Sequence, residues 1–447
     1  MVKVITYGTF DLLHRGHIKL LKRAKALGDY LIVGITADDY DMSRGKINGQ
    51  QSLMERIEAV KATGLADEIV VEEYEGQKID DILRMDVDVF AVGSDWEGKF
   101  DYLKEYCKVV YLPRTEGISS SDLRSQTRKI KLGLVGEEKT LVKFARECAY
   151  SNGAEVAAIF SKDRELVDRY FVDLRHAWDC FEDFLDYVDA LYIVSHPSLH
   201  YSQIKQALSR GKHVLCESPI ALDPRQVDEL LKLAEEKGCI LMEALKTAYS
   251  VAYYRLLLMV KSGVIGKVIS VDATCTSQRN VDTSDKRYIA KAWNSITDWG
   301  PTAMLPVFQL LGVDYRKKTI VTKYADKAAA FDLFTKVDFL YEDAVASIKV
   351  GKGVKSEGEL VVTGEKGYIY VPAPWWKTDY FEVRFEHSEN NKRYFYQLDG
   401  EGIRYEVVAF VKSIVSGHVS GYISSNVSDA ISQVLYDYYA GNDLMEI

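Results

Sequence analysis

Two closely spaced histidines are the first residues of the chain that could do chemistry. They belong to the segment Gly8-Thr9-Phe10-Asp11-Leu12-Leu13-His14-Arg15-Gly16-His17, between a predicted strand and a predicted helix. His14 and His17 would stand one turn apart at the helix N-terminus, where free N–H groups and the helix dipole favour an anion. Imidazoles there can donate to phosphate oxygens as negative charge builds in a transition state. The alternative interpretation is that both histidines only cap the helix.

A second group of anion-binding side chains follows a later predicted strand. Arg114 to Ser121 offers a guanidinium, a glycine and three hydroxyls, and it leads into a helix predicted to start near Asp122. Such a segment can cradle the phosphates of a nucleotide, although serine-rich helix starts are common on their own. Because both groups fall in one small region, together they indicate a nucleotide site.

The elements that must position these groups predict a doubly wound α/β domain. Short apolar runs are typical of parallel strands, and an amphipathic pattern from Leu20 to Leu27 predicts the first helix, with Gly28 as its stop. Ligands of such sheets bind beyond the carboxyl ends of the strands. The predicted strands are Val4–Tyr7, Leu31–Ile35, Val87–Val92 and Val109–Leu112.

Two further regions follow a basic stretch from Ser125 to Lys131. A strand–helix series predicts a second Rossmann-like domain, with strands at Lys131–Val135, Val156–Phe160, Ala190–Val194, His213–Cys216 and Cys239–Met242. Alternating segments then predict an α/β domain with a large, mostly antiparallel sheet, with strands at Val268–Thr274, Ala346–Val350, Leu360–Val362, Tyr368–Val371 and Phe381–Phe385 and helices near 300–311, 401–416 and 427–440. The predicted domains are 1–126, 130–245 and 246–447.

Three segments of the first domain carry a family resemblance: GTFDLLHRGHIKLLKRAKALGD, VGSDWEGKFDYL and YLPRTEGISSSDLR. Residues 1 to 126 resemble the glycerol-3-phosphate cytidylyltransferase family of nucleotidyltransferases. The resemblance implies the HxGH-type variant of the Rossmann fold, usually dimeric. It also implies conversion of CTP and a polyol phosphate into a CDP-polyol and pyrophosphate, with Mg²⁺ neutralising the triphosphate.

The same resemblance implies roles for individual residues. His14 and His17 would stabilise the α-phosphate and the leaving pyrophosphate, and Arg114 would hold the triphosphate, which makes these three the catalytic candidates. The nucleotide would contact Thr9, Phe10, Asp11, Asp95, Trp96, Ile118, Ser119 and Ser120, and the substrate phosphate would contact Arg44, Lys46 and Arg56. Ser94 stands where the family often has aspartate, and Ser120-Ser121 replace two threonines, but both changes keep hydrogen-bonding ability.

The rest of the chain resembles the Gfo/Idh/MocA oxidoreductase family. The resemblance rests on Ser195–His200, Gly211–Pro219, Met242–Ala244 and Asp298–Pro301. It implies a Rossmann NAD(P) domain followed by a sheet domain. The family's Glu-Lys-Pro motif, whose lysine contacts nicotinamide ribose and substrate, reads Glu217-Ser218-Pro219 here. Thr302 takes the position of a family proton donor after an Asp-Trp-Gly turn, and Lys246 faces either the same cleft or solvent.

The candidate dinucleotide site departs from its usual pattern. A GxGxxG turn lets the backbone approach a pyrophosphate, whereas Gly133 and Gly136 are followed here by Glu137 and Glu138, which oppose an anion. Phe160-Ser161-Lys162 lacks the acidic residue that binds a ribose diol, and it suits either a 2′-phosphate or a solvated turn. The candidate dinucleotide residues are therefore Gly133, Gly136, His196, Pro197 and Glu217, and NAD(P) binding stays open.

Composition limits the function classes. The chain has 447 residues, of which 47% are hydrophobic and 28% charged, as expected for a folded multi-domain protein. A net charge of -9 argues against bulk nucleic-acid binding. Six dispersed cysteines, no apolar run of membrane-spanning length and a strand-like start predict a soluble, cytoplasmic protein without a signal peptide. No metal-binding set of side chains is predicted.

The sequence leaves two functional hypotheses, and a dinucleotide-binding sensor without turnover lies between them. In the first, a homodimeric cytidylyltransferase activates a small polyol phosphate, glycerol phosphate being the leading candidate, for cell-surface polymer synthesis. The second half then serves for dimerisation, scaffolding or regulation. In the alternative, the chain is bifunctional, and its second half is an NAD(P)-dependent reductase that makes the polyol phosphate. The aromatic pair Trp375-Trp376 predicts packing against the large sheet or a dimer partner.

Overall fold

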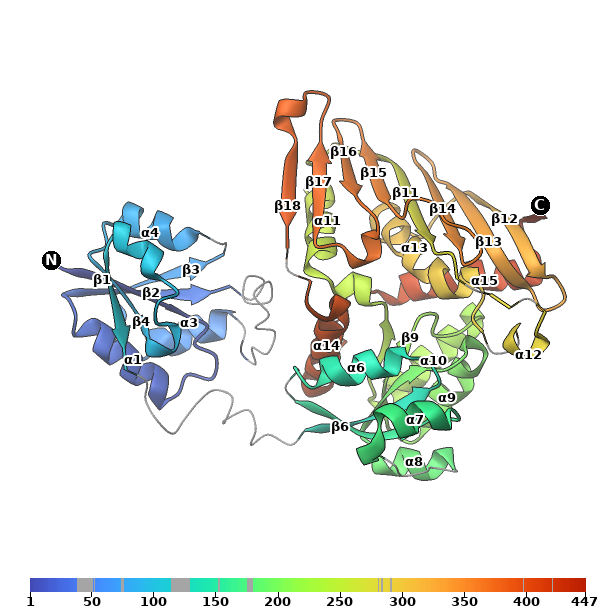
Figure 1. Ribbon diagram of the computed structural model, residues 1–447, viewed down its shortest axis with the longest axis horizontal. Helices are drawn as coiled ribbons and strands as arrows, with labels where there is room; N and C mark the ends of the chain where they lie inside the picture. Colours follow the sequence, from blue (N-terminus) through green and yellow to red (C-terminus); the bar gives the residue numbers. More distant parts are fainter. Residues whose placement is uncertain are drawn as a thin grey trace. The chain divides into compact units, whose positions relative to one another are not determined.

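A computed structural model gives the fold (Figure 1). The structure describes residues 1–37, 51, 53–73, 76–113, 129–151, 153–174, 180–279, 281–282, 284–289, 292–396, 398–419 and 421–447. The chain forms two compact units, residues 1–128 (the first unit) and residues 129–447 (the second unit).

The first unit is a doubly wound α/β domain. Its parallel sheet has the order β3-β2-β1-β4-β5, with strands β1 (Lys3–Gly8), β2 (Tyr30–Thr36), β3 (Glu68–Glu72), β4 (Val89–Gly93) and β5 (Lys108–Leu112). Its helical segments are α1 (Arg15–Lys25), α3 (Leu53–Lys61), α4 (Gln77–Met85), η1 (Ser94–Trp96) and η2 (Asp101–Glu105). The expected strands are confirmed, and β3, which the sequence analysis did not predict, adds an edge strand.

Two apolar cores cover the two faces of this sheet. Leu21 and Ala24 of α1 pack with Val60 of α3 on one face, and Ile82 of α4 packs with Phe90 on the other. These side chains are almost fully buried. The carboxyl ends of the strands are thereby held in one row, which is where an α/β sheet of this kind binds ligands.

The second unit begins with another parallel sheet, of order β10-β9-β8-β6-β7. Its strands are β6 (Ile130–Gly136), β7 (Ala154–Phe160), β8 (Ala190–Val194), β9 (His213–Glu217) and β10 (Leu241–Ala244). Its helical segments are α6 (Thr140–Cys148), α7 (Arg164–Tyr170), η3 (Val172–Leu174), α8 (Phe181–Tyr187), α9 (Pro197–Ser209) and α10 (Pro224–Lys237). The predicted second Rossmann-like region is confirmed, with its last strand two residues later than expected.

A large, mostly antiparallel sheet completes the second unit. Its order is β18-β17-β16-β15-β11-β14-β13-β12-β19, and the β11–β14 and β12–β19 pairs are parallel. The strands are β11 (Val268–Thr276), β12 (Lys317–Asp326), β13 (Phe331–Leu340), β14 (Val345–Gly351), β15 (Leu360–Gly364), β16 (Tyr368–Val371), β17 (Tyr380–Arg384), β18 (Lys392–Phe395) and β19 (Leu444–Glu446). The predicted sheet is confirmed, and β12, β13, β18 and β19 extend it.

Helices connect this sheet to the Rossmann-like part of the same unit (Figure 1). The helix α13 packs on β11, β13 and β14, and α15 contacts both α13 and α10. The helical segments are η4 (Lys246–Tyr249), α11 (Val251–Lys261), α12 (Lys286–Ile289), α13 (Ser295–Leu311), η5 (Trp375–Lys377), η6 (Ser388–Asn390), η7 (Asp399–Gly402), α14 (Ile403–Ser416) and α15 (Ser425–Ala440). No described helix is long and apolar enough to cross a membrane.

One local expectation is wrong. The Asp298-Trp299-Gly300-Pro301 segment was expected to form a turn, but it lies inside α13. Glycine and proline usually interrupt helices. Here both residues are buried in the helix, and a Cβ on Gly300 would lie 3.0 Å from Ile296. Tertiary packing of an apolar helix therefore outweighs the local propensity of these two residues.

Candidate nucleotide site and second cavity

The candidate nucleotide site lies where the order of the first sheet reverses. The strand β1 pairs with β2 on one side and with β4 on the other, so the loops that follow β1 and β4 leave the sheet side by side. The β1 loop carries the residues from Thr9 to His14, and the segment after β4 carries Asp95 and Trp96 in η1. This edge is the topological switch point at which doubly wound sheets bind ligands.

The two histidines are arranged as a stacked pair. His14 is the N-cap of α1, and its Nδ1 accepts a hydrogen bond of 3.0 Å from the Gly16 N–H. The His14 and His17 rings stack with 3.9 Å between centroids, and the buried Phe10 ring meets His17 edge-on at 5.4 Å. Because Nδ1 of His14 accepts, a neutral ring carries its proton on Nε2 and can donate from there. His14 can therefore cap the helix through Nδ1 and donate to a ligand through Nε2, so the two interpretations of the motif are compatible.

The β1 loop is held by buried polar contacts. The Arg56 side chain is fully buried, and its Nη1 donates to the carbonyls of Thr9 at 2.6 Å and Thr36 at 2.9 Å, while its Nε donates to the Gln51 carbonyl at 3.3 Å. Asp11 accepts from the Gln51 N–H at 3.0 Å. Arg56 therefore positions the loop that carries Thr9, and its predicted contact with a substrate phosphate stays a prediction.

The loop also has strained backbone and an unsatisfied hydroxyl. Phe10 and Leu12 adopt left-handed conformations, with φ of 53° and 47°. The Thr9 hydroxyl is buried and has no hydrogen-bond partner among the described residues. Strained backbone and an unsatisfied buried donor are features of sites prepared for a ligand. The remaining predicted residues of this site, Arg44, Lys46, Arg114, Ile118, Ser119 and Ser120, lie outside the described residues.

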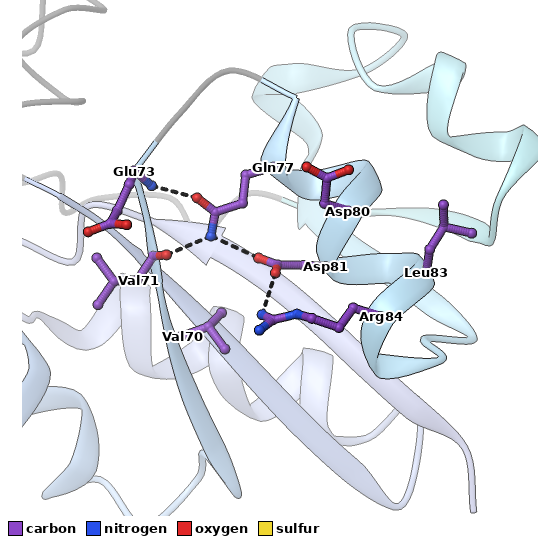
Figure 2. Close-up of a pocket in the computed structure, with 8 residues that line it drawn as sticks. All are labelled: Val70, Val71, Glu73, Gln77, Asp80, Asp81, Leu83 and Arg84. Carbon is purple, nitrogen blue, oxygen red and sulfur yellow. Dashed lines mark hydrogen bonds and ion pairs between the residues drawn. The ribbon is translucent and has the colours of Figure 1, made fainter. Parts of the chain in front are cut away.

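A cavity of the first unit lies elsewhere, between β3 and α4, and measures about 840 Å³. Figure 2 shows that the Gln77 amide joins the backbone of Glu73 and Val71 to Asp81, and that Asp81 also accepts from Arg84. Tyr7 donates to Asp81 as well, at 2.8 Å. Because these polar groups satisfy one another, they favour a structural role over ligand binding.

The second unit contains a cavity of about 580 Å³ between its Rossmann-like part and its large sheet, a volume typical of small-molecule sites. Glu217, Lys246 and Thr302 line it, so Lys246 faces the cleft, as one of the two expectations had it. The sequence analysis missed five further charged residues there or beside it: Lys143, Arg279, Lys352, Lys377 and Glu401. For one of these five residues the sequence gives a local signal: Glu401 lies between Gly400 and Gly402, and glycines so placed are typical of a tight turn.

Ser218 stands apart from this cavity. It is buried, and its hydroxyl donates to the carboxyl of the equally buried Glu243. Burial raises the pKa of Glu243, against the lowering effect of the Ser218 hydrogen bond. The serine in the Glu-Ser-Pro segment is therefore part of a buried polar pair, and it brings no positive charge to the cavity.

Glu217 is a titratable group on the wall of the cavity. Burial raises its pKa to about 7, against the lowering effects of the Tyr192 hydroxyl and of Lys246. The Tyr192 hydroxyl donates to Glu217 Oε1 at 2.5 Å. A carboxyl group with such a pKa can hold or release a proton near neutral pH.

The candidate dinucleotide residues fit a bound dinucleotide only in part. The N-terminus of α6 opens into the cavity through Thr140, which suits an anion. A Cβ on Gly136 would lie 2.6 Å from the Val194 carbonyl oxygen, and one on Gly133 would lie 2.5 Å from Phe184, so both glycines serve internal packing. Glu138 also lines the cavity, and burial, with the nearby Asp298, raises its pKa.

The other predicted residues of this region also have local contacts. His196 caps α9, with Pro197 at its first turn, and its Nδ1 lies 2.8 Å from the Ser198 hydroxyl. Ser161 accepts from the Asp163 N–H at 3.2 Å, as in a tight turn. Among the described residues no cluster of three or more metal-ligating side chains occurs.

The aromatic pair divides between core and cavity. The Trp375 side chain is fully buried, and its Nε1 donates to the Thr274 carbonyl of the large sheet at 3.1 Å. Trp376 lines the cavity and meets Trp299 at 4.8 Å between ring centroids. The expected packing against the sheet therefore holds for Trp375 only.

Comparison with known proteins identifies the first unit. Residues 5–126 match the family described as cytidylyltransferase-like. The chain is 52% identical over 124 residues to the glycerol-3-phosphate cytidylyltransferase of Bacillus spizizenii, which covers 28% of this chain and 95% of that protein. The chain belongs to the glycerol-3-phosphate cytidylyltransferase family. The enzyme of Staphylococcus aureus is 46% identical over 138 residues, or 31% of this chain and 98% of that protein.

The family membership rests on the first unit, and the second unit has other relatives. Residues 130–245 match the family described as oxidoreductase family, NAD-binding Rossmann fold. The scyllo-inositol 2-dehydrogenase (NADP(+)) of Bacillus subtilis is 30% identical over 131 residues, 27% of this chain and 38% of that protein. A 3-ketoreductase from Actinomadura kijaniata, solved with NADP and TDP-benzene, matches with a TM-score of 0.63 and 20% identity over 72% of this chain and 99% of that one. At that identity the match shows the fold alone.

Proposed function

We propose that the first unit is a cytidylyltransferase that converts CTP and a small polyol phosphate, with glycerol phosphate as the leading candidate, into a CDP-polyol and pyrophosphate. The observation that carries the proposal is the stacked His14–His17 pair at the switch point of the sheet. The named relatives are glycerol-3-phosphate cytidylyltransferases that match over almost their whole length, which supports the same substrates here. The homodimer and a role in cell-surface polymer synthesis stay predictions.

The reaction needs positioning and positive charge more than an activated nucleophile. A phosphate oxygen of the polyol phosphate attacks the α-phosphorus of CTP, a new O–P bond forms, and the bond to the β-phosphate breaks to release pyrophosphate. His14 would donate from Nε2 to phosphate oxygens while charge builds on them. Thr9 and Asp11 would line the nucleotide pocket, and the buried Arg56 would keep their loop in place. Asp95 and Trp96 would contribute to recognition of the cytosine.

Magnesium is part of the same proposal. Mg²⁺ is usually bound through substrate phosphates and one or two carboxylates, and it would neutralise charge on the triphosphate. The side chains that would hold the triphosphate are Arg114, Ile118, Ser119 and Ser120, and Arg44 and Lys46 would meet the substrate phosphate. These assignments follow from the family resemblance.

The test is pyrophosphate release from CTP with Mg²⁺ across a panel of polyol phosphates. We expect His14→Ala and His17→Ala each to lower turnover about 10²–10³-fold, the usual loss when one donor to a developing oxyanion is removed. His387→Ala is the control, because this exposed histidine lies in the large sheet domain. Near-normal turnover in both histidine variants would refute the proposal.

We propose that the second unit is divided into two domains, residues 130–245 and residues 246–447. A second candidate function belongs to this unit. Glu217, whose pKa burial raises to about 7, lies at the wall of a cavity that Thr302 and Lys246 also line. This favours a reductase that converts a carbonyl compound to the polyol. Bound NAD(P)H would supply the hydride. Glu217 would hold the proton that the new hydroxyl needs, and Trp299 and Trp376 would limit access of water.

The second candidate has its own test. We would follow NADPH and NADH oxidation with a panel of small ketones and aldehydes, with and without phosphate groups, using the intact chain. Oxidation that disappears in Glu217→Gln supports the reductase. Absence of both cofactor binding and oxidation at millimolar NAD(P)H would leave the second unit as a scaffold or regulator.

A further inference from the structure

Three lysines from separate parts of the second unit converge on one carboxylate. The Nζ atoms of Lys246 and Lys377 lie 2.8 Å and 2.7 Å from the carboxylate oxygens of Glu401, and Nζ of Lys143 lies 3.3 Å from both oxygens. Lys143 comes from α6, Lys246 from η4 and Lys377 from η5. All three lysines line the 580 Å³ cavity. Within the unit, α6 and α14, which follows the Glu401 turn, lie side by side (Figure 1).

The backbone that presents Glu401 is strained. Gly400, Glu401 and Gly402 all have left-handed conformations, with φ of 60°, 54° and 93°. A Cβ on Gly402 would lie 2.4 Å from the Lys246 carbonyl oxygen, so the turn packs directly against the segment that carries one of the lysines. A non-glycine residue in this conformation persists only where its surroundings fix it, and such residues gather at binding sites.

The cluster has an excess of positive charge. Three ammonium groups face one carboxylate, which leaves two positive charges. Among the other acids, Glu147 is paired with Arg404 at 3.0 Å and Asp298 across the cavity is paired with Lys352 at 2.5 Å. Lys246 also acts on Glu217 and Glu406, but burial raises the pKa of both carboxyls and so reduces their negative charge at neutral pH. A phosphate monoester carries close to two negative charges at neutral pH. Its oxygens can accept several charge-assisted hydrogen bonds from lysines at once.

We propose that Lys143, Lys246 and Lys377 form a phosphate subsite in the second unit, and that Glu401 holds the three lysines together until a phosphate monoester enters. The ligand class is a small carbonyl compound or polyol that carries one phosphate. The inference deepens the reductase candidate and rests on it for turnover, but the binding itself does not depend on turnover.

The positions of the lysines favour a phosphate of the substrate over one of a nucleotide cofactor. Lys246 and Lys377 follow the Rossmann-like strands in the chain, and Lys377 lies beside Trp376 on the wall formed by the large sheet. A cofactor 2′-phosphate would instead meet the turn after the second strand of the Rossmann-like sheet, where Ser161 and Lys162 lie. The subsite would give both units the same substrate chemistry, because the first unit is proposed to consume a polyol phosphate.

The experiment is a calorimetric titration of the intact chain with dihydroxyacetone phosphate as the probe, and with dihydroxyacetone as the phosphate-free control. We expect Lys143→Gln and Lys377→Gln each to weaken binding of the phosphate probe about tenfold, the cost of one charge-assisted hydrogen bond. We expect Glu401→Gln to tighten it severalfold, since the competing carboxylate charge is gone. Lys232→Gln, at an exposed site on α10, is the matched control and should change nothing.

Opposite signs for the lysine and glutamate variants are the signature of the subsite. A Glu401→Gln variant that loses its fold would be recognised by its thermal unfolding, and the two lysine variants would then decide. Unchanged affinity for dihydroxyacetone phosphate in both lysine variants overturns the proposal. Weakened NADPH binding, with NADH and the probe unaffected, would assign the lysines to the cofactor phosphate and also overturn it.

The result for the phosphate subsite can be distinguished from the results for the cytidylyltransferase and the reductase. Pyrophosphate release by the first unit should be the same in all three variants, so it reports on the cytidylyltransferase alone. Probe binding should survive His14→Ala. Binding of the phosphate probe without any NAD(P)H oxidation would keep the subsite and remove the reductase.

Discussion

Replacement of Arg56 by lysine should destabilise the first unit while leaving the second unit unchanged. The Arg56 guanidinium is fully buried and donates to the carbonyls of Thr9, Thr36 and Gln51. A lysine keeps the charge but presents it at a single nitrogen, so it cannot reproduce the fork that reaches three carbonyls. Arg56→Lys would therefore keep about one of the three contacts and leave buried carbonyl oxygens without donors.

The size of the effect follows from these contacts. A hydrogen bond from a charged donor contributes about 1.5–3 kcal/mol, so the loss of two lowers the free energy of unfolding by about 3–6 kcal/mol. For a unit of this size, that corresponds to a fall in Tm on the order of 10–20 °C. Because the freed loop carries Thr9, we also expect pyrophosphate release to fall at temperatures where the unit is still folded.

Differential scanning calorimetry of the intact chain can measure this. The two units have separate cores and should unfold in separate transitions, and CTP should raise the transition of the first unit. The control is Arg84→Lys, because the Arg84 side chain is 67% exposed and a lysine at this site keeps the positive charge beside the buried Asp81. A transition within about 3 °C of the unaltered protein for Arg56→Lys would refute the reasoning.

Two predictions concern the second unit. The pKa of Glu217 is about 7 in the folded chain, compared with 4.5 for an ordinary glutamate. Between these two pH values the folded state binds more protons than the unfolded state, so the free energy of unfolding falls as pH rises from 5 to 7. Urea unfolding should show that this fall is smaller in Glu217→Gln by about 1–3 kcal/mol. If the free energy of unfolding had the same pH dependence in the variant and the unaltered protein, the raised pKa of Glu217 would be contradicted. Gly136→Ala should cost about 2–4 kcal/mol, because φ is 133° and the new Cβ would lie 2.6 Å from the Val194 carbonyl. Gly211→Ala, with φ of 71° and open space, should cost only about 1 kcal/mol in the same denaturation assay, and equal losses would refute the packing argument.

Much of the fold was predictable because buried parallel strands are apolar runs. The strands β1, β2, β8 and β9 lie where such runs predict them. The strand β12 was missed because the buried face of its sequence KKTIVTKYAD consists of Lys318, Ile320 and Thr322, of which only the isoleucine is apolar. Lys318 in that strand is nearly buried, and it is satisfied by Asp437 and Asp443 from the end of the chain. A sequence pattern cannot show that such a distant carboxylate is present.

The two candidate sites, the histidine pair and the lysine cluster, differ in the same way: one is local in the sequence and the other is not. The histidine pair is local, so its spacing alone places both imidazoles at one helix start. The lysine cluster joins residues 143, 246, 377 and 401, which no short motif connects. Ser218 is a third case, since the family resemblance leads one to expect a lysine there, but the sequence does not show that Glu243 accepts a hydrogen bond from the serine hydroxyl. Long-range charge pairing was thus the part of the candidate sites that the sequence could not predict and the structure had to show.

The separate sheets of the two units have an evolutionary consequence. The strands β1 to β5 form one sheet, and β6 to β19 form two others, so in the described residues no sheet borrows a strand from the other unit. A substitution that weakens one core leaves the packing of the other core as it was. Each unit can therefore accumulate changes in its own core, so that a change around Ser218 in the second unit need not disturb the histidine pair of the first.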